Sequence, residues 1–86
     1  MRLVFDPTYD MGWVDFSGRR DLHHTESPFG IDQLGNVVCM NLDNLSQGID
    51  LTNPRIPAQY VDELARRLRR KGYRVRAPQP EAAAAR

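Results

Sequence analysis

The N-terminal part of the chain alternates between apolar and polar residues, which is the pattern of half-buried β-strands. Residues 2–6 form the first predicted strand, and residues 11–16 form the second. The side chains expected on their buried side are Leu3, Phe5, Val14 and Phe16. The turn between the strands contains Pro7, which fixes φ, and we expect the carboxylates of Asp6 and Asp10 to accept local backbone N–H bonds. The opening of the chain therefore predicts a β-hairpin.

Two further strands are predicted around a glycine turn in the middle of the chain. The third strand contains Phe29 and Ile31, and the fourth covers residues 37–42. Between them, the segment Gln33-Leu34-Gly35-Asn36 is predicted to form a hairpin turn in which the glycine adopts a positive φ. Residues 37–42 are the most apolar run of the chain, and this favours a central position in the sheet.

A helix from Pro57 to Lys71 is the clearest element in the pattern. Apolar side chains recur along one stripe at helical spacing, and this stripe consists of Tyr60, Val61, Leu64 and Leu68. Pro57 suits the first helical position, and Gly72 suits the left-handed residue that follows the last turn. An acid four residues before a base stabilises a helix. The two ion pairs expected on this ground are Asp62–Arg66 and Glu63–Arg67.

The segments that flank the helix complete the predicted fold. Residues 43–53 are expected to form a packed connection with a short strand near Ile49, and residues 73–76 alternate as a final strand. Residues 77–86 have little to bury and are expected to be a disordered tail. The predicted fold is α+β: a small, mostly antiparallel sheet of four to five strands with one amphipathic helix packed on a face. We expect residues 1–76 to form a single domain.

The charges of the chain are separated along the sequence. Residues 1–53 carry three arginines against eight acids, a net charge of −5, and residues 54–86 carry nine basic side chains against three acids, a net charge of +6. The basic segment of residues 66–76 contains no acid, and its basic side chains are Arg66, Arg67, Arg69, Arg70, Lys71, Arg74 and Arg76. Guanidinium groups bind phosphate bidentately, whereas helix C-termini favour cations in any case. The basic segment therefore predicts a surface for nucleic acid or an acidic partner, or else a solvated helix face.

Two stretches of the chain are similar to one known family. MRLVFDPTYDMGWVDF resembles the opening of the bacterial domain-of-unknown-function family 2283, in which a strand ends in an aromatic residue and Asp before a short turn and an aromatic-rich strand. GIDQLGNVVCMNL, residues 30–42, resembles the second hairpin of that family. The acidic and small residues common after the first turn are replaced here by Thr8, Tyr9 and Met11, and the C-terminal helix is an addition. The resemblance implies a small sheet-based domain, and it implies no activity and no functional residue.

Two histidines are the main candidates for chemistry. His23 and His24 lie beside Asp21 and Glu26 in residues 17–27, a polar segment without periodicity that is interpreted as a surface loop. Adjacent histidines can chelate a metal ion. The spacing of established metal-binding motifs is absent, however, and an exposed polar loop explains the same residues equally well. We therefore predict no metal and no cofactor.

The single Cys39 cannot form an internal disulfide. Its place in an apolar strand predicts a core residue rather than a catalytic thiol. The N-terminus lacks the apolar region of a signal peptide, and the chain contains no run of about 18 apolar residues. We expect no membrane association and a cytoplasmic location. The basic residues are eleven arginines and one lysine, which suggests a GC-rich bacterial genome.

The functional prediction follows from the size of the chain and its aromatic residues. A chain of 86 residues has little room for a catalytic cleft, so an enzyme is not expected. The first hypothesis is a small non-enzymatic protein-interaction module that forms a homodimer or binds another protein. Aromatic residues dominate binding hot spots. The predicted interface residues are Tyr9, Trp13 and Phe29, with core packing as the alternative. The second hypothesis is nucleic-acid binding through the basic segment, and the third is a metal-dependent enzyme that uses the histidine pair.

Overall fold

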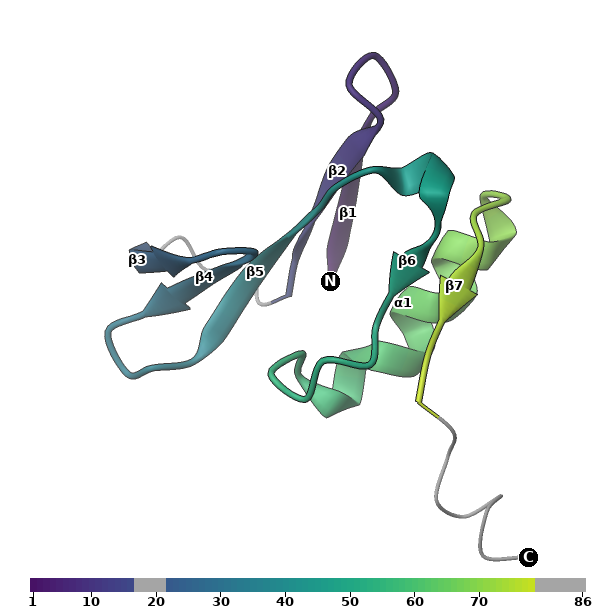
Figure 1. The fold of residues 1–86 in the computed structure, drawn as a ribbon. Helices are drawn as coiled ribbons and strands as arrows, with labels where there is room; N and C mark the ends of the chain where they lie inside the picture. The colour runs from purple at the N-terminus through teal and green to yellow at the C-terminus, as the bar shows by residue number, and fades with distance from the viewer. Residues whose placement is uncertain (17–21, 79–86) are drawn as a thin grey trace, which may run out of the picture. The chain divides into compact units, whose positions relative to one another are not determined.

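The computed structural model describes residues 1–16 and 22–78. The chain divides into two compact units, Met1–Gln47 and Gly48–Arg86. The first unit contains a five-stranded antiparallel sheet, and the second contains one α-helix and a small two-stranded sheet (Figure 1). The fold is therefore α+β, and the prediction of the fold class is confirmed. No helix among the described residues is long and apolar enough to cross a membrane.

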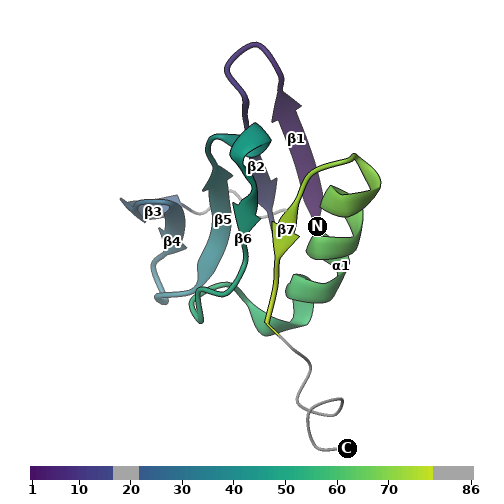
Figure 2. The same ribbon diagram turned by 45° about the vertical axis from the view of Figure 1, so that its right-hand side comes forward.

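The sheet of the first unit has its most apolar strand in the middle. The strands are β1 (Arg2–Asp6), β2 (Met11–Asp15), β3 (Leu22–Glu26), β4 (Phe29–Asp32) and β5 (Val37–Leu42). Their order across the sheet is β1-β2-β5-β4-β3, as Figure 2 shows. The central position predicted for residues 37–42 is confirmed. An apolar run suits this position because both edges of the strand are paired, so less of it meets water.

The strand register divides the side chains of the sheet between two faces. Leu3 lies opposite Val14, Val14 lies opposite Met40, and Met40 lies opposite Phe29, so these residues share one face. Three of the four are buried. The apolar core residues of this unit are Val14, Phe16, Phe29, Ile31, Val38, Met40, Leu42 and Leu45. Of the side chains predicted on the buried side of the first two strands, Val14 and Phe16 are in the core, and Leu3 and Phe5 are half-buried.

Strand β3 corrects the interpretation of residues 17–27 as a loop. Residues 22–26 pair with β4 in an antiparallel ladder and lie at one edge of the sheet. All five side chains of β3 are exposed. The alternation of apolar and polar residues that marks a half-buried strand is therefore missing, because neither face of this edge strand is buried. Residues 17–21 lie outside the described part of the chain.

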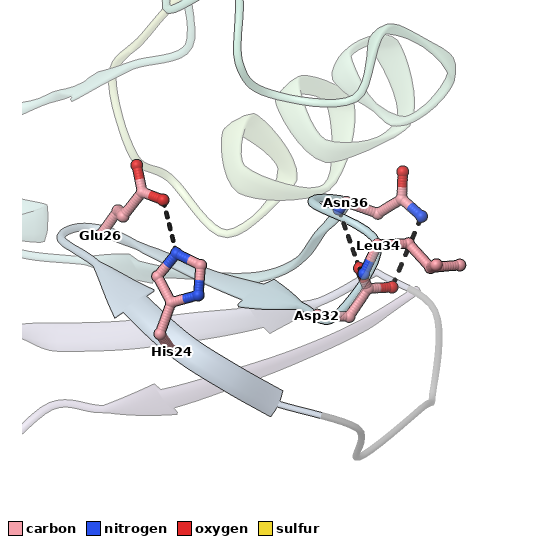
Figure 3. A network of polar contacts seen from close by, with 5 residues as sticks. All are labelled: His24, Glu26, Asp32, Leu34 and Asn36. Carbon is pink, nitrogen blue, oxygen red and sulfur yellow. Dashed lines mark hydrogen bonds and ion pairs between the residues drawn. The ribbon is translucent and has the colours of Figure 1, made fainter.

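A buried carboxylate holds the turn between β4 and β5. Gly35 has a φ of +83°, as predicted for this turn. Asp32 is only 5% exposed. Its Oδ1 accepts the backbone N–H groups of Leu34 and Asn36, both at 2.9 Å. Its Oδ2 lies 3.5 Å from Nδ2 of the Asn36 side chain (Figure 3). These hydrogen bonds compensate for the hydration that the carboxylate loses on burial, and they fix the register of the hairpin.

Asp10 connects the β1–β2 turn to a distant part of the sheet unit. Asp6 accepts the local N–H of Thr8 at 3.2 Å, which confirms its predicted role. The local role predicted for the Asp10 carboxylate is wrong. Its oxygens accept the Ser46 N–H at 3.0 and 3.1 Å and the Ser46 hydroxyl at 2.6 Å, 36 positions along the chain. Ser46 lies in the short 3₁₀ helix η1 (Leu45–Gln47) that follows β5, so Asp10 fixes this segment against the first hairpin.

The second unit is built on helix α1 (Ala58–Arg70) and the strands β6 (Ile49–Asp50) and β7 (Val75–Arg76). The strands predicted near these positions are confirmed. They pair with each other in parallel rather than with the antiparallel sheet, so the helix connects two parallel strands (Figure 1). The buried apolar side chains of this unit are Ile49, Leu51, Ile56, Val61, Leu64, Ala65 and Leu68.

Both ends of α1 follow from local sequence. Pro57 is the residue before the first helical turn, with φ −56° and ψ 120°, so the helix begins one residue later than predicted. At the other end, Gly72 has a φ of +97°, as predicted. Its N–H donates to the carbonyl of Arg69 at 2.9 Å, and the Tyr73 N–H donates to the carbonyl of Leu68 at 3.1 Å. This pair of bonds is a Schellman motif, which stops the helix and leads the chain into β7.

Candidate binding surfaces

The basic segment runs from the last turns of α1 through the Schellman turn to β7. All of its basic side chains are exposed. The net charge of the second unit, residues 48–86, is +5, from nine basic side chains against four acids. The first unit, residues 1–47, has three arginines against seven acids and a net charge of −4. The separation of charge seen in the sequence therefore follows the division of the chain into units.

Two arginines of the basic segment are engaged locally within the second unit. The Nε of Arg67 lies 3.9 Å from Oε2 of Glu63, so one of the two predicted ion pairs is present. Arg69 donates from Nη2 to the carbonyl oxygen of Val75 at 3.1 Å. This bond joins the end of the helix to β7. The other predicted pair, between Asp62 and Arg66, does not form among the described residues.

A third arginine of the basic segment faces an acid across the parallel strands. Arg76 is the register partner of Asp50. The pKa of Asp50 lies below its ordinary value, chiefly because Thr52 donates its hydroxyl at 2.6 Å and its N–H at 2.9 Å, and also because of the charge of Arg76. The positive charge of Arg76 is therefore partly compensated within its own unit.

Three arginines of the basic segment have no such partner. The side chains of Arg66, Arg70 and Arg74 make no hydrogen bond or ion pair with any residue in the described part of the chain. Arg66 and Arg70 lie one turn apart, about 6 Å along the axis, on the side of α1 away from its buried stripe. From position 62 to position 71, every exposed side chain of the helix and its cap is charged. This outer face has no apolar centre.

The second candidate surface is the face of the five-stranded sheet opposite Val14 and Met40, here called the open face. Val4 lies opposite Trp13 on this face, and Trp13 lies opposite Asn41. Trp13 is 46% exposed, and its neighbour along the strand, Met11, is also exposed. A half-exposed tryptophan with an exposed methionine and a half-buried valine beside it is an apolar patch on strands β1 and β2.

Apolar side chains continue across the open face towards β3. Gly30 of β4 lies opposite Cys39 of β5. A side chain at Gly30 would collide with Leu22 Cδ1 and Cys39 Sγ, so these two side chains cover the glycine. Leu22 is exposed. Cys39 is half-buried rather than fully buried, so it belongs to the open face and not to the core that the sequence predicted.

Charged residues flank the apolar patch along β1. Arg2, Val4 and Asp6 alternate along the strand and so lie on the open face in the order positive, apolar, negative. Arg2 lies opposite Asp15, and Asp6 lies opposite Met11. When two copies of β1 are placed antiparallel, the positive end of each strand meets the negative end of the other, and the two valines meet in the middle.

The structure separates the three predicted interface residues. Trp13 lies on the open face and is exposed, and Tyr9 is exposed in the turn between β1 and β2. Phe29 is only 2% exposed and packs in the core, so the prediction of Phe29 as an interface residue is wrong. All four residues of its strand are buried, and the strand lies between β5 and β3.

The histidine pair lies on β3. The Nε2 of His24 and Oε2 of Glu26 are 2.6 Å apart, and both side chains are about half exposed (Figure 3). The ring of His23 meets that of His24 edge-on, with centroids 5.4 Å apart. Within residues 1–16 and 22–78, no three His, Cys, Asp or Glu side chains are grouped to hold a metal ion. Asp21, the fourth member of the predicted group, lies outside those residues.

Comparisons with protein-family models, curated proteins and solved structures found no match to this chain. The resemblance of residues 1–42 to the domain-of-unknown-function family 2283 stays a prediction from the sequence.

Proposed function

We propose that the protein is a small non-enzymatic protein-interaction module that forms a homodimer through the open face of its sheet. The observation that carries this proposal is the half-exposed Trp13 in an apolar patch with Val4 and Met11. Tryptophan is the residue type most enriched at binding hot spots. A bacterial origin, a cytoplasmic location and the binding of further proteins belong to the same proposal.

A second copy of the chain is the occupant that fits this surface. A sheet unit of 47 residues buries a small core, and a partner that covers its open face extends that core. Most soluble oligomers are symmetric homo-oligomers, so a patch that is complementary to itself is expected at such an interface. The order of Arg2, Val4 and Asp6 on β1 has this property.

The charges on β1 also select the orientation of the two copies. Consider a two-fold axis that lies in the plane between the two open faces and runs perpendicular to the strands. This axis places β1 antiparallel over the partner's β1. Arg2 then faces the partner's Asp6, and Trp13 faces the partner's Trp13. An axis parallel to the strands would place Arg2 over the partner's Arg2 instead. Ion pairs at the rim of an interface contribute little affinity, but like charges opposed there select against the wrong orientation.

A charge exchange tests this arrangement. Energy transfer between donor-labelled and acceptor-labelled copies measures the dissociation constant of the homodimer. Arg2→Glu places like charges against the partner's Asp6 and is expected to raise that constant by about tenfold, and Asp6→Lys acts in the same direction. The double variant Arg2→Glu/Asp6→Lys restores opposite charges and is expected to regain most of the affinity.

Circular dichroism confirms that each variant is folded, which matters because Asp6 also accepts the N–H of Thr8. Absence of energy transfer in the wild-type protein at tens of micromolar rejects the homodimer. Energy transfer that is unchanged by Arg2→Glu rejects the antiparallel orientation and retains the homodimer.

A further inference from the structure

The outer face of α1 carries arginines that form no ion pair or side-chain hydrogen bond within the described part of the second unit. Arg67 and Arg76 are near Glu63 and Asp50, and Arg69 binds a backbone carbonyl. The side chains of the remaining arginines, Arg66 and Arg70 on the helix and Arg74 beyond it, have no hydrogen bond or ion pair among the described residues. Because these exposed guanidinium groups have no partner of their own in that part of the chain, an external anion can bind them without breaking an internal bond.

The charges on this face suit a phosphate-containing partner better than they suit another protein. The core of a protein–protein interface is depleted of charged residues and enriched in aromatic ones. Protein–nucleic acid interfaces are more polar and much more positive. The outer face contains only charged side chains between positions 62 and 71, and its acids, Asp62 and Glu63, lie at the end away from the cluster.

We propose that Arg66, Arg70 and Arg74 bind the phosphate backbone of a nucleic acid. Arg66 and Arg70 project from successive turns of the helix, and Arg74 lies two residues beyond Gly72, where the Schellman motif ends the helix. The contacts are to phosphates and are therefore independent of base sequence. This site lies within the second unit, and it goes beyond the homodimer proposed for the open face.

Salt dependence is the measurement that tests this site. Fluorescein-labelled probes are titrated with the full chain and followed by anisotropy: a short DNA duplex, one of its strands alone, and the RNA strand of the same sequence. Binding to at least one probe is expected at about 50 mM NaCl. For the duplex, three phosphate contacts that each release condensed counterions predict affinity about fortyfold weaker at about 200 mM. The probe bound most tightly identifies the form of nucleic acid.

The triple variant Arg66→Gln/Arg70→Gln/Arg74→Gln removes the proposed contacts, and glutamine keeps a similar helix propensity. The slope of log affinity against log salt is expected to fall by about 3 for a duplex. Arg55→Gln removes an exposed arginine outside the basic segment and is expected to leave the slope within one unit of wild type. No binding of any probe at about 50 mM overturns the proposal, as does a triple variant with the wild-type slope. The proposal is also overturned if poly-glutamate, a polyanion without phosphate, binds as tightly as DNA of the same total charge.

Discussion

Replacing Trp13 with serine is expected to raise the dissociation constant of the homodimer by about thirtyfold or more. Trp13 is 46% exposed at the centre of the apolar patch on β1 and β2, so the partner would bury much of its indole ring. Truncation of a central aromatic residue costs about 2 kcal/mol or more at a hot spot. Each dimer loses two indole rings, which stack against each other in the proposed antiparallel arrangement. Energy transfer between labelled copies measures the change.

The control for this variant is another exposed apolar residue on the same sheet. Leu34 is exposed in the turn between β4 and β5, away from the open face. Leu34→Ser also replaces an exposed apolar side chain with serine. It is expected to leave the dissociation constant within about twofold of wild type, because this turn lies outside the proposed interface. Equal effects of Trp13→Ser and Leu34→Ser would mean that the open face is not the interface.

Leu64→Ala is expected to lower the free energy of unfolding by about 2–5 kcal/mol. Leu64 is 0% exposed and lies in the middle of the buried stripe of α1. Its removal loses the transfer free energy of the side chain and leaves a cavity that the neighbouring side chains fill only in part. Urea unfolding followed by circular dichroism measures this loss, and the same helix presents the basic segment.

Gln59 supplies the matched control on the same helix. Its side chain is exposed on the opposite side of α1 from Leu64. Gln59→Ala is expected to change the free energy of unfolding by less than about 0.5 kcal/mol, since surface substitutions away from special features have small effects. A loss below about 1 kcal/mol for Leu64→Ala would contradict the packing of α1 in this unit.

The elements that could be predicted from sequence are those with strong local signals. Alternation in residues 2–6 and 11–16 marks the first hairpin, and the helical stripe marks α1. Gly35 and Gly72 mark the turns where the backbone needs positive φ. In each case the periodicity or the glycine reports a local conformation directly, because the burial pattern repeats within a few residues.

The features that could not be predicted depend on partners distant in sequence. Strand β3 is exposed on both faces, so its sequence carries no alternation. The sequence around Asp10 predicts an ordinary turn residue, because its hydrogen-bond partner, Ser46, is distant in sequence. The parallel pairing of β6 with β7 also joins segments on either side of the helix. Strand pairing is set by the whole fold, and local patterns do not report it. The single domain expected over residues 1–76 stays a prediction.

The candidate surfaces were visible in the sequence only as residue types. The arginines between positions 66 and 76 define the basic segment in the sequence. Only the fold distinguishes Arg76, which faces Asp50, from Arg70, whose side chain has no partner in the described residues. Trp13 and Phe29 likewise appear equivalent in an alternating strand. Register and strand order place the first on the open face and the second in the core.

Sedimentation equilibrium of the purified wild-type chain tests most directly whether two copies associate through the open face of the sheet. At tens of micromolar, we expect a mass close to twice the 9.9 kDa of one chain. On dilution the mass should fall towards that of one chain, and Trp13→Ser should shift this transition to higher concentration. A mass of one chain at every concentration would contradict the account.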